Sequence, residues 1–398
     1  MLDILMIVVS SFVAIFVGFY LSYYAICWFY IRKKNSVIEA DSNNNLLKVS
    51  IIVPVFNEVN VLKHRIENFN ELNYPKDKLE IVFVDGGSTD GSIQLLKGLT
   101  KQSELSIKTL FQGKRKGFNS AVGEGFAVTT GDIICITGAE TEYDPEALNM
   151  MMRHFKDPTI GAVTGKQKIK NENDGFSPKL EIAYRNLYDF VREGESCIDS
   201  PFDLKGEISA ARRKIVKALV ENPNLLQKGC IDACFSFQGR LDGYKTVFEP
   251  RAVYYELSPK SMRDSFKQQT RRAATLIENM LAFKNMIFRK EFKAFGMLIM
   301  PAHFLMLIVL PYFLIFAAIG IVISAVLNPS NLLFLSLLIV GLLSIFVSRR
   351  VKAFMKTQLV LIVTGLKLLK GVETQKFERL QSARPCQFKQ KDVGGKSE

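Results

Sequence analysis

The chain has 398 residues, 48% of them hydrophobic, and a formal net charge of +13. This length allows one large domain or two medium ones, including a catalytic core of roughly 200–250 residues. Much of the positive charge lies beside apolar segments, where basic side chains meet anionic lipid headgroups. The composition therefore favours a membrane surface as a partner and argues against nucleic acid.

The first predicted element is an apolar segment at the amino end. No charged residue occurs within residues 4–31, and about 20 apolar residues are enough for a helix to cross a bilayer. A cleaved signal peptide is the alternative, but the run is long for one and Asp3 stands where a basic start is expected. The sequence predicts a transmembrane anchor over residues 1–31 and a polar linker over residues 32–48.

The pattern then changes to that of an α/β domain, predicted over residues 49–258. Short runs rich in β-branched residues are typical of buried strands and occur at residues 49–56, 79–84 and 133–137. Apolar residues at helical spacing occur at residues 58–69, 92–99 and 118–128. This alternation predicts a mostly parallel sheet whose ligand binds at the carboxyl ends of the strands.

The carboxyl-terminal third is again largely apolar. Residues 259–293 mix basic and apolar residues and predict amphipathic helices along the membrane face. Residues 294–348 lack charged residues and are broken by Asn328-Pro329-Ser330-Asn331, which predicts a transmembrane helical hairpin. Residues 349–398 predict a basic tail, and its apolar run at 358–365 is too short to span and predicts an interfacial helix.

Basic residues beside the predicted spans indicate their orientation. Three follow the first span and three follow the last: Arg32, Lys33, Lys34, Arg349, Arg350 and Lys352. Such residues remain in the cytoplasm. The sequence therefore predicts an integral membrane protein with its amino terminus outside and residues 33–293 in the cytoplasm.

Polar residues and glycines occur where the first two predicted strands end. Pro54-Val55-Phe56-Asn57-Glu58 closes the first, and Asp85-Gly86-Gly87-Ser88-Thr89-Asp90-Gly91 closes the second. Backbone N–H groups and side chains are available to a ligand at such positions, and Asp85 is placed to accept hydrogen bonds from a nucleotide base or ribose. The alternative is an aspartate that caps the next helix, with glycines in a tight turn.

A basic loop follows, in the segment Gly113-Lys114-Arg115-Lys116-Gly117-Phe118-Asn119. It leads into the helix predicted from residue 118. A helix amino terminus and nearby ammonium groups would together stabilise a diphosphate, for which Lys114 and Lys116 are the candidates. A solvated basic loop is the alternative.

In this order, the motifs resemble those of a family-two glycosyltransferase with the GT-A fold, over about residues 49–272. Gly131-Asp132 and Glu249-Pro250 also fall on recurrent pairs of that family. The resemblance implies a membrane-anchored enzyme of the lipid-linked glycan type that uses a nucleotide-diphosphate sugar. It implies donor contacts from the strand ends and the basic loop: Pro54, Asn57, Glu58, Asp85, Lys114, Lys116 and Asn119.

The chain departs from this family at two acidic positions. Gly86 replaces the second aspartate of the nucleotide-binding turn, and Gly138-Ala139-Glu140 replaces the metal-binding Asp-x-Asp. Hard divalent cations require carboxylate oxygens, of which Glu140 supplies one and Gly138 none. The resemblance implies Mg²⁺ or Mn²⁺ as the cofactor, with Glu140 as its protein ligand.

An inverting transfer needs a carboxylate near the acceptor hydroxyl. In the family, an acidic motif is followed by a leucine three positions later and then by Gly-Tyr. Here Asp232, Phe235 and Gly243-Tyr244 keep that spacing, although Ile231 replaces the preceding acid. The resemblance thus implies Asp232 as the catalytic base; a helix-starting aspartate favoured by the helix dipole is the alternative.

The segment Gln268-Gln269-Thr270-Arg271-Arg272-Ala273 is similar to the Gln-x-x-Arg-Trp motif of many relatives, without its aromatic residue. Arg271 and Arg272 are candidates for binding the donor diphosphate, with lipid headgroups as the alternative. The missing aromatic residue and the few predicted spans argue against a processive polysaccharide synthase.

The expected activity is transfer of one sugar to a polyprenyl-phosphate-type lipid or a lipid-linked saccharide. A polysaccharide synthase and a catalytically silent nucleotide-sugar-binding subunit are the alternatives.

Overall fold

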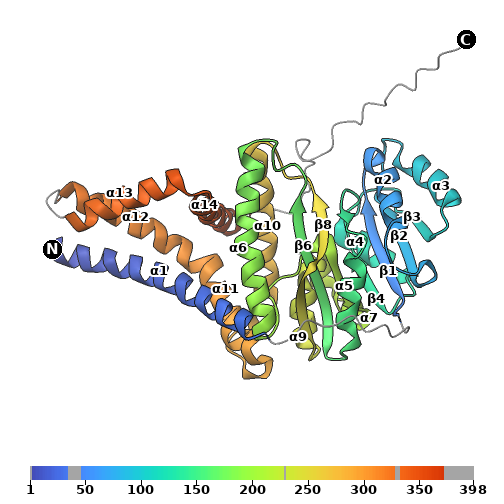
Figure 1. Ribbon diagram of the computed structural model, residues 1–398, viewed down its shortest axis with the longest axis horizontal. Coiled ribbons are helices and arrows are strands. Elements are labelled where there is room, and N and C mark those ends of the chain that lie inside the picture. Colours follow the sequence, from blue (N-terminus) through green and yellow to red (C-terminus); the bar gives the residue numbers. More distant parts are fainter. Residues whose placement is uncertain (1, 35–45, 228–229, 328–331, 372–398) are drawn as a thin grey trace, which may run out of the picture.

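The computed structural model describes residues 2–34, 46–227, 230–327 and 332–371. Most of the predicted linker, the turn at 328–331 and the tail beyond residue 371 lie outside the described residues. Within them, an α/β domain and a group of long apolar helices lie at opposite ends of the molecule (Figure 1).

A mixed, mostly parallel sheet forms the centre of the α/β domain. Its eight strands have the order β3-β2-β1-β4-β7-β6-β8-β5. Neighbours pair in parallel, except that β7 is antiparallel to β4 and β6, and β5 is antiparallel to β8. The strands are β1 Val49–Val55, β2 Leu79–Asp85, β3 Ser106–Phe111, β4 Ile133–Ile136, β5 Glu142–Tyr143, β6 Ile160–Ile169, β7 Ser209–Arg212 and β8 Lys245–Glu256.

Helices cover both faces of this sheet, as expected for strands that are apolar on both sides. The three predicted strands and three predicted helices are confirmed as β1, β2, β4, α2, α3 and α4. Apolar side chains of β1 alternate between two cores, since Ile51 and Val53 face one and Ile52 faces the other. The helices of this domain are α2 Val59–Asn70, α3 Ser92–Gln102, α4 Phe118–Val128, α5 Ala147–Met152, α6 Phe176–Ile198, α7 Arg213–Val220, α8 Pro223–Gln227, α9 Phe235–Leu241 and α10 Met262–Ala282.

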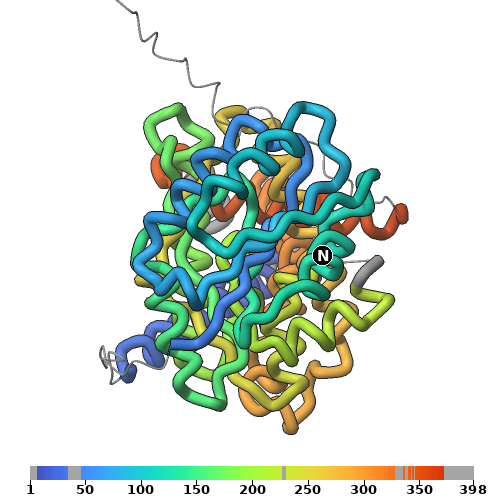
Figure 2. Tube along the Cα trace, turned by 90° about the vertical axis from the view of Figure 1, so that its right-hand side faces the viewer, coloured from blue at the N-terminus to red at the C-terminus, as the bar shows by residue number. Residues whose placement is uncertain are grey.

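The apolar helices extend away from the sheet beyond α6 and α10 (Figure 1). They are α1 Leu2–Lys33, α11 Met300–Phe304, α12 Leu310–Leu327, α13 Leu332–Val347 and α14 Arg349–Leu369, with π-helical stretches at Phe295–Ile299 and Leu305–Val309. In Figure 2, which faces the α/β end, the blue-to-green chain of the first strands and helices lies in front of the orange and red helices.

Two of the described segments, Ile7–Lys33 and Phe295–Leu327, are long and apolar enough to cross a membrane by length and composition. Protein covers only 17% and 33% of their most apolar windows. Large apolar side chains such as Leu21, Phe316 and Val326 are therefore more than half exposed. A contiguous surface of this kind is unusual on a protein surrounded by water. Helix α13 packs against α12, and the transmembrane hairpin stays a prediction.

The apolar run predicted as a short interfacial helix is the centre of the longer helix α14. Helix α14 packs on α6 and α10, and Val360 and Thr364 are buried. Gln358 is also buried, and its Nε2 donates to Tyr20 Oη of α1 at 3.2 Å. The opposite face of α14 is partly exposed, with Leu359 and Leu366 about half accessible. One side of the helix is therefore buried against the α/β domain, and the other side is partly exposed.

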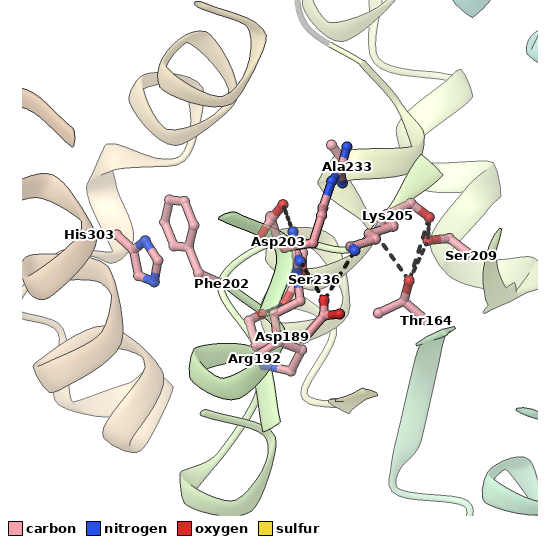
Figure 3. A network of polar contacts seen from close by, with 12 residues as sticks. Thr164, Asp189, Arg192, Phe202, Asp203, Lys205, Ser209, Ala233, Ser236 and His303 are labelled. Carbon is pink, nitrogen blue, oxygen red and sulfur yellow. Dashed lines mark hydrogen bonds and ion pairs between the residues drawn. The ribbon is translucent and has the colours of Figure 1, made fainter. Parts of the chain in front are cut away.

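A buried carboxylate joins the apolar helices to the α/β domain. Glu195 of α6 accepts hydrogen bonds from Tyr23 Oη of α1 at 2.6 Å and from the Phe202 backbone N–H at 2.8 Å. His303 Nε2 of α11 lies 2.5 Å from the same carboxylate, and its ring stacks on Phe202 with centroids 3.9 Å apart (Figure 3). A single acidic side chain thus connects three helices and the start of a loop.

Candidate active site

A cavity of about 1140 Å³ opens at the carboxyl ends of β1 and β4 and continues between α6, α10 and α14. Eight of the eleven residues predicted for the site line it: Pro54, Glu58, Lys116, Asn119, Glu140, Asp232, Arg271 and Arg272. The other three, Asn57, Asp85 and Lys114, are not among its lining residues. The predicted base and the predicted metal ligand therefore share one cavity.

The two strand-end loops are held together by side chains of the turn after β2. The Asn57 N–H donates to Ser88 Oγ at 2.7 Å, and Asn57 Oδ1 accepts from the Thr89 N–H at 2.7 Å. Asn57 has a φ of +56°, which asparagine tolerates better than most residues. The Glu58 N–H donates to Ser92 Oγ at 2.8 Å. Asn57 thus fixes the loop that carries Glu58 into the cavity.

Asp85 is fully buried at the end of β2 and shapes the following turn. Its carboxylate accepts from the N–H groups of Gly87 and Ser88, each at 2.9 Å, and from Ser88 Oγ at 2.5 Å. Gly87 has a φ of +84°, the left-handed region that favours glycine. A nucleoside contact by Asp85 stays a prediction, while the geometry assigns it a role in the turn.

The basic loop presents Arg115 and Lys116 to the cavity. Arg115 lies over the ring of Phe56, with its guanidinium carbon 4.4 Å from the ring centroid. Lys116 Nζ is 2.9 Å from Glu124 Oε1. The sequence did not single out Arg115, whose contact with Phe56 joins the loops that follow β1 and β3.

Asn119 connects the basic loop's helix to the segment that carries the predicted base. Its Nδ2 donates to the Leu225 carbonyl at 2.9 Å, and its Oδ1 accepts from the Ile231 N–H at 3.3 Å. Because Ile231 directly precedes Asp232, Asn119 positions the backbone of the predicted base. A donor contact by Asn119 stays a prediction.

Asp232 is buried at the start of a 3-10 turn, Asp232–Cys234, that leads into α9. Burial raises the pKa of its carboxyl to about 6, with a hydrogen bond from Cys230 lowering it and the charge of Glu207 raising it. Gly206 lies directly against it, since a methyl group at Gly206 would overlap Asp232 Oδ2. A carboxylate with this pKa can accept a proton near neutral pH.

Glu140 occupies the loop after β4 and folds back over Gly138. Its Oε2 lies 2.9 Å from where a Cβ of residue 138 would stand. The glycine therefore leaves room for the longer glutamate to reach back into the cavity. Among the described residues, no three acidic, histidine or cysteine side chains gather as a metal site. Mg²⁺ commonly takes one or two carboxylates together with substrate phosphates, so Glu140 fits a cation held partly by a diphosphate.

Two further carboxylates, Glu207 and Glu256, line the cavity beside Arg272. Arg272 Nη2 is 2.8 Å from Glu207 Oε1 and 3.6 Å from Glu256 Oε1. Burial acts to raise the pKa of Glu207, but the charges of Arg272 and Arg185 outweigh it and bring that pKa well below its usual range. Burial and the charge of Glu207 leave the pKa of Glu256 raised. Arg272 thus holds an acidic pair in place.

One wall of the cavity carries paired charges from α6 and from the loop before β7, and Figure 3 shows their contacts. Arg192 Nη2 is 2.8 Å from Asp203 Oδ2, and Lys205 Nζ is 3.1 Å from Asp189 Oδ1. Burial lowers the pKa of Lys205 to about 7, partly offset by the charge of Asp189. A cluster of charges this deeply buried is rare away from ligand sites.

The sequence analysis did not identify this wall, although its residues follow a helical pattern. Glu181, Arg185, Asp189 and Arg192 recur at three- and four-residue intervals along α6, together with Tyr184 and Tyr188. Polar residues at this spacing inside a long helix that is otherwise packed on both sides were the available signal.

Residues 50–220 match the sequence model of the family described as glycosyl transferase family 2. This part of the chain is a glycosyltransferase domain. A mannosyltransferase from Pyrobaculum calidifontis, solved in complex with GDP-Man and Mn²⁺, superposes on it with a TM-score of 0.79 and 24% identity. That superposition covers 93% of this chain and 100% of the other. It establishes the GT-A fold of this glycosyltransferase domain.

Curated relatives of the glycosyltransferase domain include poly-β-1,6-N-acetyl-D-glucosamine synthases. The protein of Staphylococcus epidermidis is 22% identical over 265 residues, which are 65% of this chain and 63% of that protein. The protein of Staphylococcus aureus strain MSSA476 is 23% identical over 225 residues, 56% and 53% of the two chains. The chain therefore matches between about half and two thirds of the length of these relatives.

Proposed function

We propose that the chain transfers one sugar, with inversion, from a nucleotide-diphosphate donor to a lipid-linked acceptor at the cytoplasmic face of a membrane. The observation that carries this proposal is that Asp232 and Glu140 line one cavity together with Arg271 and Arg272. A base, a cation ligand and two guanidinium groups are the side chains that such a transfer requires.

The donor diphosphate lies between Lys116 of the basic loop and the two arginines of α10. Arg272 is held by its ion pair with Glu207, so its guanidinium is oriented before the donor arrives. Glu140 would hold Mg²⁺ or Mn²⁺, which when bound neutralises charge on the diphosphate leaving group.

Asp232 removes the proton from the acceptor hydroxyl as that oxygen attacks the anomeric carbon. The bond from the anomeric carbon to the donor phosphate oxygen breaks, and the nucleoside diphosphate carries away the bonding electrons. The proton remains on Asp232 until solvent removes it. The raised pKa of this carboxyl supports the assignment, because a base with a pKa near 6 is ionised at neutral pH and still takes up a proton.

The exposed apolar helices support anchoring in a bilayer. Helix α1 and the segment that ends with α12 are apolar around most of their circumference and little covered by protein. In water this surface would be unfavourable by about 25 cal/mol for each Å². With the basic residues beside their ends, the proposed orientation has the glycosyltransferase domain in the cytoplasm and the amino terminus outside.

The second candidate is a processive polysaccharide synthase, which the curated relatives favour. Arg272 or Ala273 stands where the similar motif has an aromatic residue, and both line the cavity. The absence of that aromatic residue supports single transfer instead. The length of the product separates the two candidates.

The test uses the purified full chain in lipid nanodiscs, a panel of nucleotide sugars that includes GDP-mannose and UDP-N-acetylglucosamine, and total polyprenyl lipids. Mass spectrometry should find one lipid product heavier by a single sugar residue, and Asp232→Asn should abolish it while donor binding remains. A ladder of products would favour the synthase. Donor binding without any product would favour a catalytically silent binding subunit.

A further inference from the structure

The wall of the cavity formed by α6 carries two neighbouring tyrosines. Tyr184 and Tyr188 are one helical turn apart, and their ring centroids are 4.7 Å apart at an interplanar angle of 45°. Both rings line the cavity and both are only partly buried. Aromatic rings left open inside a cavity offer a flat apolar surface to a ligand. In α10, Arg272 or Ala273 stands where the similar Gln-x-x-Arg-Trp motif has an aromatic ring.

The charged groups around these rings form pairs of opposite charge. Arg185 Nε is 2.8 Å from Glu181 Oε1, and Arg192 is paired with Asp203. Each of these guanidinium groups is therefore already paired with a carboxylate. A neutral ligand rich in hydroxyl groups would find both hydrogen-bond donors and acceptors there.

Lys205 carries N–H donors without a hydrogen-bond acceptor among the described residues. It is 4% exposed, lines the cavity, and its Nζ makes one ion-pair contact, with Asp189. No hydrogen bond of good geometry to Nζ is found among the described residues. An ammonium group has three N–H donors, and buried donors are normally satisfied. The N–H groups of Lys205 that are not directed at Asp189 therefore indicate that a ligand binds beside this side chain.

This wall adjoins the proposed base. Lys205 is followed by Gly206, whose Cα lies directly against the carboxylate of Asp232. A ring that packs on the tyrosines and accepts hydrogen bonds from Lys205 would lie beside Asp232. One of its hydroxyl groups would then be close enough to give up its proton.

We propose that Tyr184, Tyr188 and Lys205 form an acceptor subsite that binds a saccharide ring. The inference rests on the proposed function and narrows it: the acceptor presents a sugar, and a bare lipid phosphate is not the group that enters this part of the cavity. The tyrosines of α6 take the place of the aromatic residue that α10 lacks. Two apolar residues that also line the cavity, Leu307 and Leu361, are then left for the lipid portion.

The experiment is saturation-transfer NMR on the full chain in a zwitterionic detergent, without donor, so that no turnover occurs. The probes are methyl glycosides of mannose, glucose, galactose and N-acetylglucosamine. Irradiation of aromatic protons should transfer saturation to the ring C–H protons of at least one glycoside. The double variant Tyr184→Leu/Tyr188→Leu should lower this signal at least fivefold.

Two matched variants separate the aromatic surface from the fold. Tyr184→Phe/Tyr188→Phe keeps both rings and should keep the signal. Tyr255→Leu removes a partly buried tyrosine of β8 that does not line this cavity and should leave the signal unchanged.

The inference is wrong if no glycoside receives saturation from the unmodified chain, or if the double leucine variant keeps the signal. It is also wrong if citronellyl phosphate, followed by its ³¹P resonance, binds in a Lys205-dependent manner while the glycosides do not. Nucleotide-sugar binding, measured separately by calorimetry, reports on the proposed function itself. Its absence in the unmodified chain would count against that function, whatever the glycosides do.

Discussion

Replacing Asp232 by asparagine should increase the stability of the protein while removing its activity. Burial and the neighbouring Glu207 disfavour the charged form of this carboxyl. An asparagine has nearly the same shape and no charge to bury. The substitution therefore relieves an electrostatic cost that the active site carries in its resting state.

The pKa of Asp232 sets the size and the pH range of this effect. Its pKa rises from an ordinary value of 3.8 to about 6, which corresponds to about 3 kcal/mol at about 1.4 kcal/mol for each tenfold change in proton affinity. The stability associated with the protonated carboxyl is fully present below about pH 4. It is lost as the pH rises through about 6. At pH 8 the asparagine variant should thus be more stable by up to about 3 kcal/mol.

The assay is denaturant unfolding of the full chain in detergent at pH 4 and pH 8, followed by circular dichroism. The stability difference between the variant and the unmodified protein should be near zero at pH 4 and large at pH 8. Asp77→Asn is the control, since Asp77 is exposed and its replacement should give the same small difference at both pH values. If the difference in free energy of unfolding between Asp232→Asn and the unmodified protein does not change with pH, the reasoning is refuted.

Three other outcomes test the cavity. Gly206→Ala would force the Asp232 carboxylate out of position, so the transfer rate should fall at least 100-fold with donor affinity unchanged; Gly98→Ala, in open space on α3, should leave the rate unchanged. Glu140→Gln removes the carboxylate from the proposed cation site and should raise the Mn²⁺ concentration needed for donor binding at least tenfold, measured by calorimetry. Arg272→Met leaves two acidic neighbours uncompensated and should lower the free energy of unfolding by about 3 kcal/mol, whereas a change below about 0.5 kcal/mol would show that the ion pairs contribute little.

The first half of the α/β domain could be predicted from the sequence because three of its buried strands are continuous apolar runs. The strands β1, β2 and β4 lie in the interior of the sheet, and their composition is sufficient to identify them. The other five strands were not predicted. β3 and the two-residue β5 are edge strands, and β3 is only partly buried. In β6, β7 and β8 the apolar residues are interrupted by polar and charged ones. The strand-end motifs were found because parallel strands bring their carboxyl ends to one edge.

The roles of individual residues were less predictable, because they depend on which groups the fold brings together. Asp85 and Asn119 occupy the expected positions, yet their side-chain oxygens bond to the protein's own backbone. The acidic pair of Glu207 and Glu256 comes from segments far apart in the sequence, and only their shared contact with Arg272 relates them. The spacing of residues along the chain does not predict such a contact between distant segments.

The contact of Glu195 with both Tyr23 and His303 has a practical consequence for handling this protein. Shortening the chain at its amino end would leave the carboxylate without the phenol that donates to it. It would also uncover the part of α6 against which α1 packs. The same helix carries Tyr184 and Tyr188, which line the cavity. Helix α1 therefore stabilises α6 and with it one wall of the cavity. Activity measured on a chain that lacks α1 would be that of a destabilised protein.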